Sequence, residues 1–313
     1  MPISLYAVHH LTFNETFQKI KKLLFLWSRA IRIKFLLASA IAVTNGIAIS
    51  YWEIGYVDLA YALLTYFGIM CLHISVDLLN DYSDFKRGID TNTKRTKYSG
   101  GTGVIPENLI NSRLIYSAGI IFLILGGLTG LYFVTIKGII ILILLIFAII
   151  SIYFYSTNIV NAGLGELFVA IKGCMIVLGS YYIQSDTIGI TSIYVGIIIG
   201  LLSAVVLLVT SFPDYEADKK SGRRTLIIVM GKENSVKLFI MIVGITYAMI
   251  IGGSIFNIMP IFSTIGLLSM PFAIKAAHKL RRFNDASELV SSMANSVIYS
   301  RVCGILLAIS FFI

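Results

Sequence analysis

Charged side chains are scarce in this chain of 313 residues. Only 13% of them are Asp, Glu, Lys or Arg, whereas 57% are hydrophobic, and the mean hydropathy is +0.87. A soluble domain of this length has too little interior to bury so much apolar surface. The composition therefore excludes an ordinary soluble protein and predicts an integral membrane protein.

Cysteine is also scarce, with Cys71, Cys174 and Cys303 as its three residues. All three fall inside apolar segments, and their spacing suits neither a disulfide framework nor a zinc site, so we expect buried thiols.

The glycine-rich run 98–106 lacks the Lys-Ser/Thr pair of a nucleotide-binding P-loop, and could be a loop over a polar site or a passive linker. Residues 1–22 lack an apolar block that ends in small residues, so we expect no cleavable signal peptide.

Nine apolar segments are long enough to cross a membrane, for which a helix needs about 20 mostly apolar residues. They cover residues 31–51, 58–80, 114–135, 137–156, 163–183, 189–212, 236–256, 258–275 and 294–312. We predict an all-α fold: a bundle of about nine transmembrane helices around a central chamber, in a single domain over residues 1–313.

Basic residues gather on one side of this predicted bundle. Six lie before or at the start of the first segment, six after the second, six after the sixth and four after the eighth, which leaves Lys137, Lys172 and Arg301 elsewhere. The positive-inside rule then predicts a cytoplasmic N-terminus, in the cell membrane. Lipid contact accounts for the net charge of +9, so we expect no nucleic-acid partner.

Two polar segments follow the second and sixth apolar segments and resemble each other. "NDYSDFKRG" (80–88) and "PDYEADKKSG" (213–222) share Asp-Tyr, a further Asp, a Lys and a Gly. Internal repeats are common in membrane bundles and tend to place a site between them. The pattern indicates either a duplication of segments 1–4 and 5–8 or a chance similarity.

The first polar segment carries acidic residues at helical spacing. If the helix continues beyond residue 80, Asp77, Asn80, Asp81 and Asp84 share one face, with His73 a turn further into the membrane. A solvated helix end is the alternative interpretation. Ionisable groups that face inward at membrane depth are usually functional, so we favour a binding site.

The second polar segment adds Asp214 and Asp218, four residues apart on one face. Oxygen ligands without His or Cys favour a hard cation such as Mg²⁺, which takes one or two carboxylates and completes its shell with water and phosphate. Two acidic clusters on the same side predict a site that binds a diphosphate through Mg²⁺.

Cations near these clusters are candidates for the phosphate oxygens, although any of them could instead contact anionic lipid. The candidate diphosphate-binding residues are Arg32, Lys34, Lys86, Lys94, Lys172 and Arg223. Lys172 differs from the rest because it lies in the middle of an apolar segment, where a cation costs at least about 2.5 kcal/mol. We favour a pocket-facing role for Lys172 over a structural buried pair.

These motifs resemble those of the UbiA-type intramembrane prenyltransferases, over the whole chain in the number and spacing of segments. The family pattern is Asn-Asp-x-x-Asp with a further Asp downstream, and Asp-x-x-x-Asp in the second half of the chain. Here the matching residues are Asn80, Asp81, Asp84, Asp90, Asp214 and Asp218. The resemblance implies metal ligation by Asn80, Asp84, Asp90, Asp214 and Asp218, and catalytic roles for Asp81, Asp84, Asp214 and Asp218. It also implies that Tyr155 and Ser156 lie near the diphosphate.

Asp90 stands two residues after Gly88, whereas many members have the downstream Asp at the position of Gly88. This spacing, with "LGELF" and "FPDYEADKKSGRRTL", is similar to the menaquinone (dihydroxynaphthoate) branch. Thr210, where that branch often has Asn, and Lys172 depart from the pattern.

The expected function is Mg²⁺-dependent transfer of a polyprenyl group from its diphosphate to a naphthoate- or benzoate-like acceptor at the cytoplasmic face of the bilayer. We assign His73 and Asp77 to the acceptor or prenyl pocket. Asp77, Asp81 and the departing diphosphate stay open as the proton acceptor.

The alternatives to this function are a glycerophosphate ether lipid as acceptor, a terpene cyclase, and a cation or proton transporter. A transporter should carry ionisable residues deep in several segments, whereas here only Lys172 and Arg301 lie deep.

Overall fold

The computed structural model describes residues 5–88, 95–154, 160–220 and 222–313, and every regular element among them is helical. In chain order these are α1 (Leu5–Ala30), α2 (Ile33–Ile54), α3 (Leu59–Lys86), α4 (Ser112–Lys137), α5 (Ile139–Phe154), η2 (Val160–Ala162), α6 (Gly165–Ser185), α7 (Ile190–Thr210), α8 (Tyr215–Lys220), α9 (Leu226–Met230), α10 (Lys232–Ile255), η3 (Ile261–Ser269), α11 (Met270–Leu280) and α12 (Ala286–Ser310).

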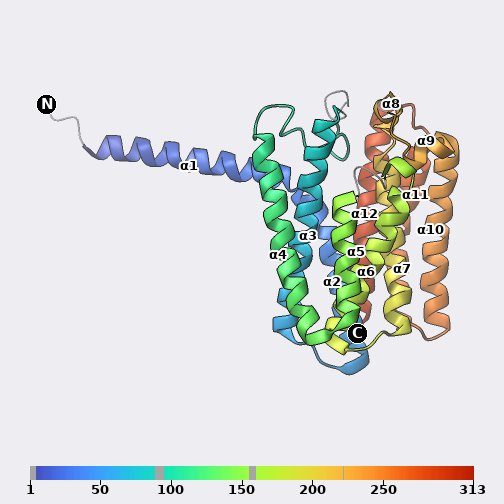
Figure 1. Ribbon diagram of the computed structural model, residues 1–313. Helices are drawn as coiled ribbons and strands as arrows, with labels where there is room; N and C mark the ends of the chain where they lie inside the picture. The colour runs from blue at the N-terminus through green and yellow to red at the C-terminus, as the bar shows by residue number, and fades with distance from the viewer. Residues whose placement is uncertain (1–4, 89–94, 155–159, 221) are drawn as a thin grey trace.

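All nine predicted segments coincide with helices, which confirms the fold class. Among the described residues, eight helical stretches are long and apolar enough to cross a membrane: α2, α3, α4, α6, α7, α10, the continuous pair η3–α11, and α12. The segment predicted at 137–156 corresponds to the shorter apolar helix α5, and its last two residues lie outside the described part of the chain. The membrane helices run side by side, with α8 and α9 at one end of the bundle (Figure 1).

Helix α1 precedes the first predicted segment and does not join the bundle. It extends sideways from the bundle (Figure 1). Its last turns pack on the other helices, where Leu26 and Trp27 contact a buried cluster that contains Leu78 of α3 and Ile115 of α4. Arg29 anchors the same end, since its Nε donates to the carbonyl oxygen of Thr102 over 2.6 Å.

Side-chain caps and glycines set the ends of several membrane helices. Asp58 accepts a hydrogen bond from the Tyr61 amide over 2.9 Å at the start of α3, and Asn111 accepts one from the Arg113 amide over 2.8 Å at the start of α4. Gly55 ends α2 with φ of 70°, a left-handed conformation that suits glycine. These ends hold the α2–α3 connection short, so the two helices are antiparallel neighbours.

Large apolar side chains are exposed on the outside of the bundle. Ile121 and Leu128 of α4 and Ile143 and Ile146 of α5 are each about half exposed. Such a surface would be unstable in water. It is stable in a bilayer, because the lipid tails are as apolar as these side chains. The helices satisfy their own backbone hydrogen bonds, as a membrane interior requires.

Helices α6 and α7 pack closely because glycines meet at their contact. A Cβ atom added at Gly173 would lie 2.9 Å from the Cα of Gly200, and one added at Gly200 would overlap the backbone of Ala170. Small residues at such positions allow the backbones of membrane helices to approach each other. This contact fixes the position of α6, one wall of the chamber described below.

Replacing Gly200 with Ala should therefore lower the thermal stability of the protein purified in detergent. The added methyl group must push α6 and α7 apart, and overpacking of this kind costs about 1–3 kcal/mol. Gly127→Ala in α4 is the matched control, because no atom lies within 4 Å of its added Cβ. Its Tm should stay unchanged or rise slightly, and equal losses of Tm in both variants would contradict the close contact.

Candidate active site

A cavity of about 440 Å³ lies inside the bundle, in the size range of small-molecule binding sites. Its walls come from α2 to α7 and from α12, which confirms the predicted central chamber. Helix α3 lines it from Thr65 to Asp84, a length of about 28 Å, or nearly the thickness of a bilayer core.

The lining of the chamber changes in character along its length. Ile69 and Leu72 of α3, Phe133 of α4, Leu145 of α5 and Phe168 of α6 make most of it apolar. At one end it turns polar, and there the lining residues are Asn80, Asp84, Asp214, Asp218 and Arg223. The shape therefore suits a molecule with a long apolar part and an anionic or metal-bound head.

A single guanidinium joins the two acidic clusters at the polar end. Arg223 donates to both oxygens of Asp84, over 2.9 and 3.2 Å, and lies 3.5 Å from Oδ1 of Asp218. These three side chains are only 11%, 8% and 5% exposed. The predicted meeting of the two clusters is thus present, with Arg223 between them.

The backbone after α7 explains how these groups come together. The chain leaves α7 at Thr210 and forms one helical turn in which the Asp218 amide donates to the Asp214 carbonyl oxygen over 2.8 Å. The two Asp side chains therefore share a face, as their spacing predicts. The chain then reverses at Gly222, with φ of 74°, and the Arg223 amide donates to the Asp218 carbonyl oxygen over 2.9 Å.

The donor set at this end fits a hard divalent cation. Asn80, Asp84, Asp214 and Asp218 offer only oxygen and amide groups, and all four line the chamber. Asn80 also donates to Oδ2 of Asp84 over 3.2 Å. Within the described residues no three His, Cys, Asp or Glu side chains are close enough to hold an ion by themselves.

Asp81 points elsewhere and is not among the lining residues. Its Oδ1 accepts a hydrogen bond from Arg32 over 2.5 Å, and its other oxygen accepts one from the Thr102 hydroxyl. Sequence reasoning did not identify Thr102, which lies 21 residues away. Asp81 thus ties α3 to the glycine-rich loop, of which Tyr98, Ser99, Gly100 and Gly101 line the chamber beside the acidic end.

The other predicted diphosphate contacts lie in different places. Arg32 lines the chamber, whereas the exposed side chains of Lys34 and Lys86 do not. Lys86 instead lies over the Tyr82 ring, 5.7 Å from its centroid. Four predicted site residues lie outside the described part of the chain, namely Asp90, Lys94, Tyr155 and Ser156.

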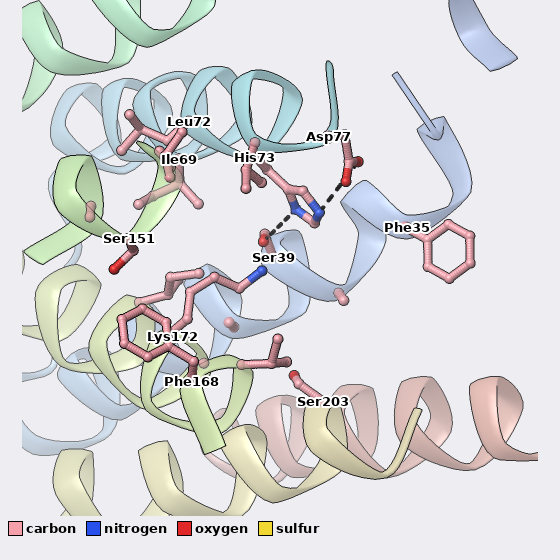
Figure 2. Close-up of a pocket in the computed structure, with 18 of the residues that line it drawn as sticks. Phe35, Ser39, Ile69, Leu72, His73, Asp77, Ser151, Phe168, Lys172 and Ser203 are labelled. Atoms are coloured by element: carbon pink, nitrogen blue, oxygen red, sulfur yellow. Dashed lines mark hydrogen bonds and ion pairs between the residues drawn. The ribbon is translucent and has the colours of Figure 1, made fainter. Parts of the chain in front are cut away.

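A second polar group of side chains lies further into the chamber (Figure 2). His73 Nδ1 is 2.7 Å from the Ser39 hydroxyl, and His73 Nε2 is 3.7 Å from Oδ2 of Asp77. Lys172 of α6 extends toward them from the facing wall (Figure 2). Sequence reasoning missed Ser39, which has no charge and no motif to distinguish it from the other small residues of α2.

Both the sequence and the fold of this chain are similar to those of known proteins. The model of the UbiA prenyltransferase family matches residues 39–299. A 1,4-dihydroxy-2-naphthoate octaprenyltransferase of Bacillus subtilis (strain 168) is 27% identical over 282 residues, 89% of this chain and 89% of that protein. A protein of the same name from Escherichia coli (strain K12) is 25% identical over 309 residues, 92% and 95% of the two chains. A solved structure of a UbiA homolog from Archaeoglobus fulgidus bound to DMAPP and Mg²⁺ has a TM-score of 0.62 at 16% identity, and covers 90% of this chain and 99% of that one.

The bridge made by Arg223 predicts a pH-dependent stability. Burial raises the pKa of Asp218, and the nearby Arg223 lowers it in part. When the pKa of a carboxyl is higher in the folded than in the unfolded state, the free energy of unfolding falls as the pH rises from the unfolded to the folded pKa. Arg223→Gln removes the compensating charge, so its Tm, measured with EDTA, should fall further below that of the parent protein at about pH 7.5 than at about pH 5.

The exposed neighbour Arg224 supplies the control for this measurement. Arg224→Gln should leave Tm nearly unchanged at both pH values, since surface charges contribute little. A loss of Tm in Arg223→Gln that does not depend on pH would contradict the bridge.

Proposed function

The chain belongs to the UbiA prenyltransferase family and is a prenyltransferase, and on this premise we propose that it transfers a polyprenyl group from an isoprenoid diphosphate to an aromatic acceptor. The observation that carries the proposal is the chamber itself. It joins a long apolar wall to a polar end where Asp84, Asp218 and Arg223 meet. An isoprenoid diphosphate has the same division into an apolar tail and a charged head.

Relatives support a naphthoate-like acceptor. Two proteins that align with about nine-tenths of this chain are named 1,4-dihydroxy-2-naphthoate octaprenyltransferases. We therefore propose a hydroxynaphthoate acceptor and a role in menaquinone biosynthesis. The basic residues near the polar end favour a cytoplasmic active site in the cell membrane.

Asn80, Asp84, Asp214 and Asp218 would hold Mg²⁺, with Asp90 as a further ligand in the sequence pattern. A solved relative of the same fold is bound to DMAPP and Mg²⁺. When bound, Mg²⁺ neutralises the diphosphate and makes it a better leaving group.

The chain's own residues bind and shield the substrates. Arg223 and Arg32 face the polar end, where their guanidinium groups can bind phosphate oxygens in pairs of hydrogen bonds. Arg223 would then exchange its contacts with Asp84 and Asp218 for contacts with phosphate. The apolar wall from Ile69 to Leu72 excludes water from the allylic carbon while the bond to the diphosphate breaks.

Asp84→Asn and Asp218→Asn should each lower prenyl transfer by about 100-fold or more, because each removes a charged group from a buried site that must hold the diphosphate and its metal. Transfer is measured as label from a radioactive prenyl diphosphate that enters a lipid-soluble product. Asp186→Asn is the matched control, since Asp186 is exposed and pairs with Lys137 over 2.7 Å, away from the chamber. Retained activity in either purified variant that keeps its Tm would refute the assignment.

A panel of acceptors tests the substrate class. With labelled prenyl diphosphate and Mg²⁺ we expect product from 1,4-dihydroxy-2-naphthoate, and none after EDTA treatment. Product only from a glycerophosphate acceptor would replace the aromatic proposal with an ether-lipid activity. A labelled hydrocarbon formed without any acceptor would indicate a terpene cyclase.

A further inference from the structure

The polar side chains in the middle of the chamber, His73, Asp77 and Lys172, lie apart from its acidic end. Asp77 precedes Asp84 by seven residues on α3, a separation of about 10 Å along the helix. His73 lies a further turn away from the acidic end. If the diphosphate binds at the acidic end, a group bound beside these side chains would lie inward of it, on the side of the allylic carbon that an acceptor attacks.

Lys172 is the most unusual of these side chains. It lies within the membrane-spanning part of α6 and lines the chamber. Across the described residues, no hydrogen bond and no ion pair within 4 Å is formed by its amino group. A cation at this depth is costly to bury without a counter-ion, so a ligand that pairs with it gains a strong interaction.

The opposite wall presents groups whose bonding capacity is only partly used. Oδ2 of Asp77 is buried and accepts no hydrogen bond within the described residues. His73 Nε2 lies 3.7 Å from it, too far for a hydrogen bond, while Ser39 holds the other ring nitrogen at 2.7 Å. His73 and Asp77 are 9% and 15% exposed, and the chamber is what they face.

Together these groups describe the ligand that would satisfy them. The ammonium of Lys172 requires an anion, and the carboxylate of Asp77 with the imidazole of His73 requires a hydroxyl that can donate and accept. The apolar side chains of Ile69, Leu72 and Phe168 beside them favour an apolar body, and the Phe168 ring can stack on an aromatic one. A hydroxy-substituted aromatic carboxylate has all three features.

We propose that Lys172, Asp77 and His73 form the acceptor subsite of the chamber, in which Lys172 binds the carboxylate of a hydroxyaryl acid. This inference rests on the proposed prenyl transfer to an aromatic acceptor and assigns the residues that select it. It moves Lys172 from the predicted diphosphate contacts to the acceptor. Lys172 then determines which aromatic compounds are accepted.

Two acceptors that differ only in the carboxylate test the proposal, 1,4-dihydroxy-2-naphthoate and 1,4-dihydroxynaphthalene. The parent protein should prefer the first by about tenfold or more in kcat/KM, the expected value of a buried charged contact. Lys172→Met should lose this preference through a higher KM for the carboxylate, with the KM for the prenyl diphosphate unchanged. An unchanged preference, or a higher KM for the diphosphate alone, would overturn the proposal.

Binding to the full-length protein in detergent separates this inference from the proposed function. By calorimetry, 1-hydroxy-2-naphthoate should bind about tenfold more tightly than 1-naphthol, and Lys172→Met should abolish the difference. If the parent protein transfers no prenyl group to any aromatic compound, the proposed function fails, but this binding difference still tests the subsite. Equal binding of the two naphthalenes to the parent protein would refute the subsite.

Lys137→Met is the matched control, because Lys137 pairs with Asp186 and does not line the chamber. It should change neither the acceptor preference nor the two KM values. Lys172→Met should also keep or raise Tm, since it removes a buried charge that has no close partner. A collapse of Tm in Lys172→Met would instead indicate a structural role and overturn the proposal.

Discussion

The polar end of the chamber depends on the ion pairs that Arg223 forms with Asp84 and Asp218. Without a cation between them, Asp84 and Asp218 would repel each other in a site where both are nearly buried. The guanidinium holds the end of α3 against the turn that follows α7. In the proposed reaction the same guanidinium would bind phosphate while the carboxylates hold the metal ion.

The membrane imposes the second constraint, because it makes the interior of the bundle the only place for polar groups. The outer faces of α4 and α5 carry exposed Ile and Leu side chains, whereas carboxylates, cations and hydroxyls line the chamber. Glycines at the contact of α6 and α7 bring these helices close together, and Lys172 of α6 faces α3 across the chamber. The lipid-facing side of each helix thus carries apolar side chains, and the chamber-facing side carries the polar ones.

Predictions from the sequence were most accurate where a local pattern decides the outcome. The four-residue spacing of Asp214 and Asp218 places them on one face because a helical turn forms there. The same reasoning grouped Asp81 with Asn80 and Asp84, but Asp81 bonds to Arg32 and Thr102 at the side of α3. Helical spacing cannot choose between adjacent residues near the edge of a face, because the neighbouring loop decides which of them is covered.

The sequence by itself determined the class of the protein, since the length and apolar character of a membrane helix are properties of consecutive residues. It also determined the two acidic motifs and their family. Only the tertiary structure decided that Arg223 pairs with Asp84, 139 positions away, and that Lys172 faces His73 and Asp77. The reason is physical: such contacts arise from how closely whole helices pack, and that depends on side chains distributed over the entire bundle.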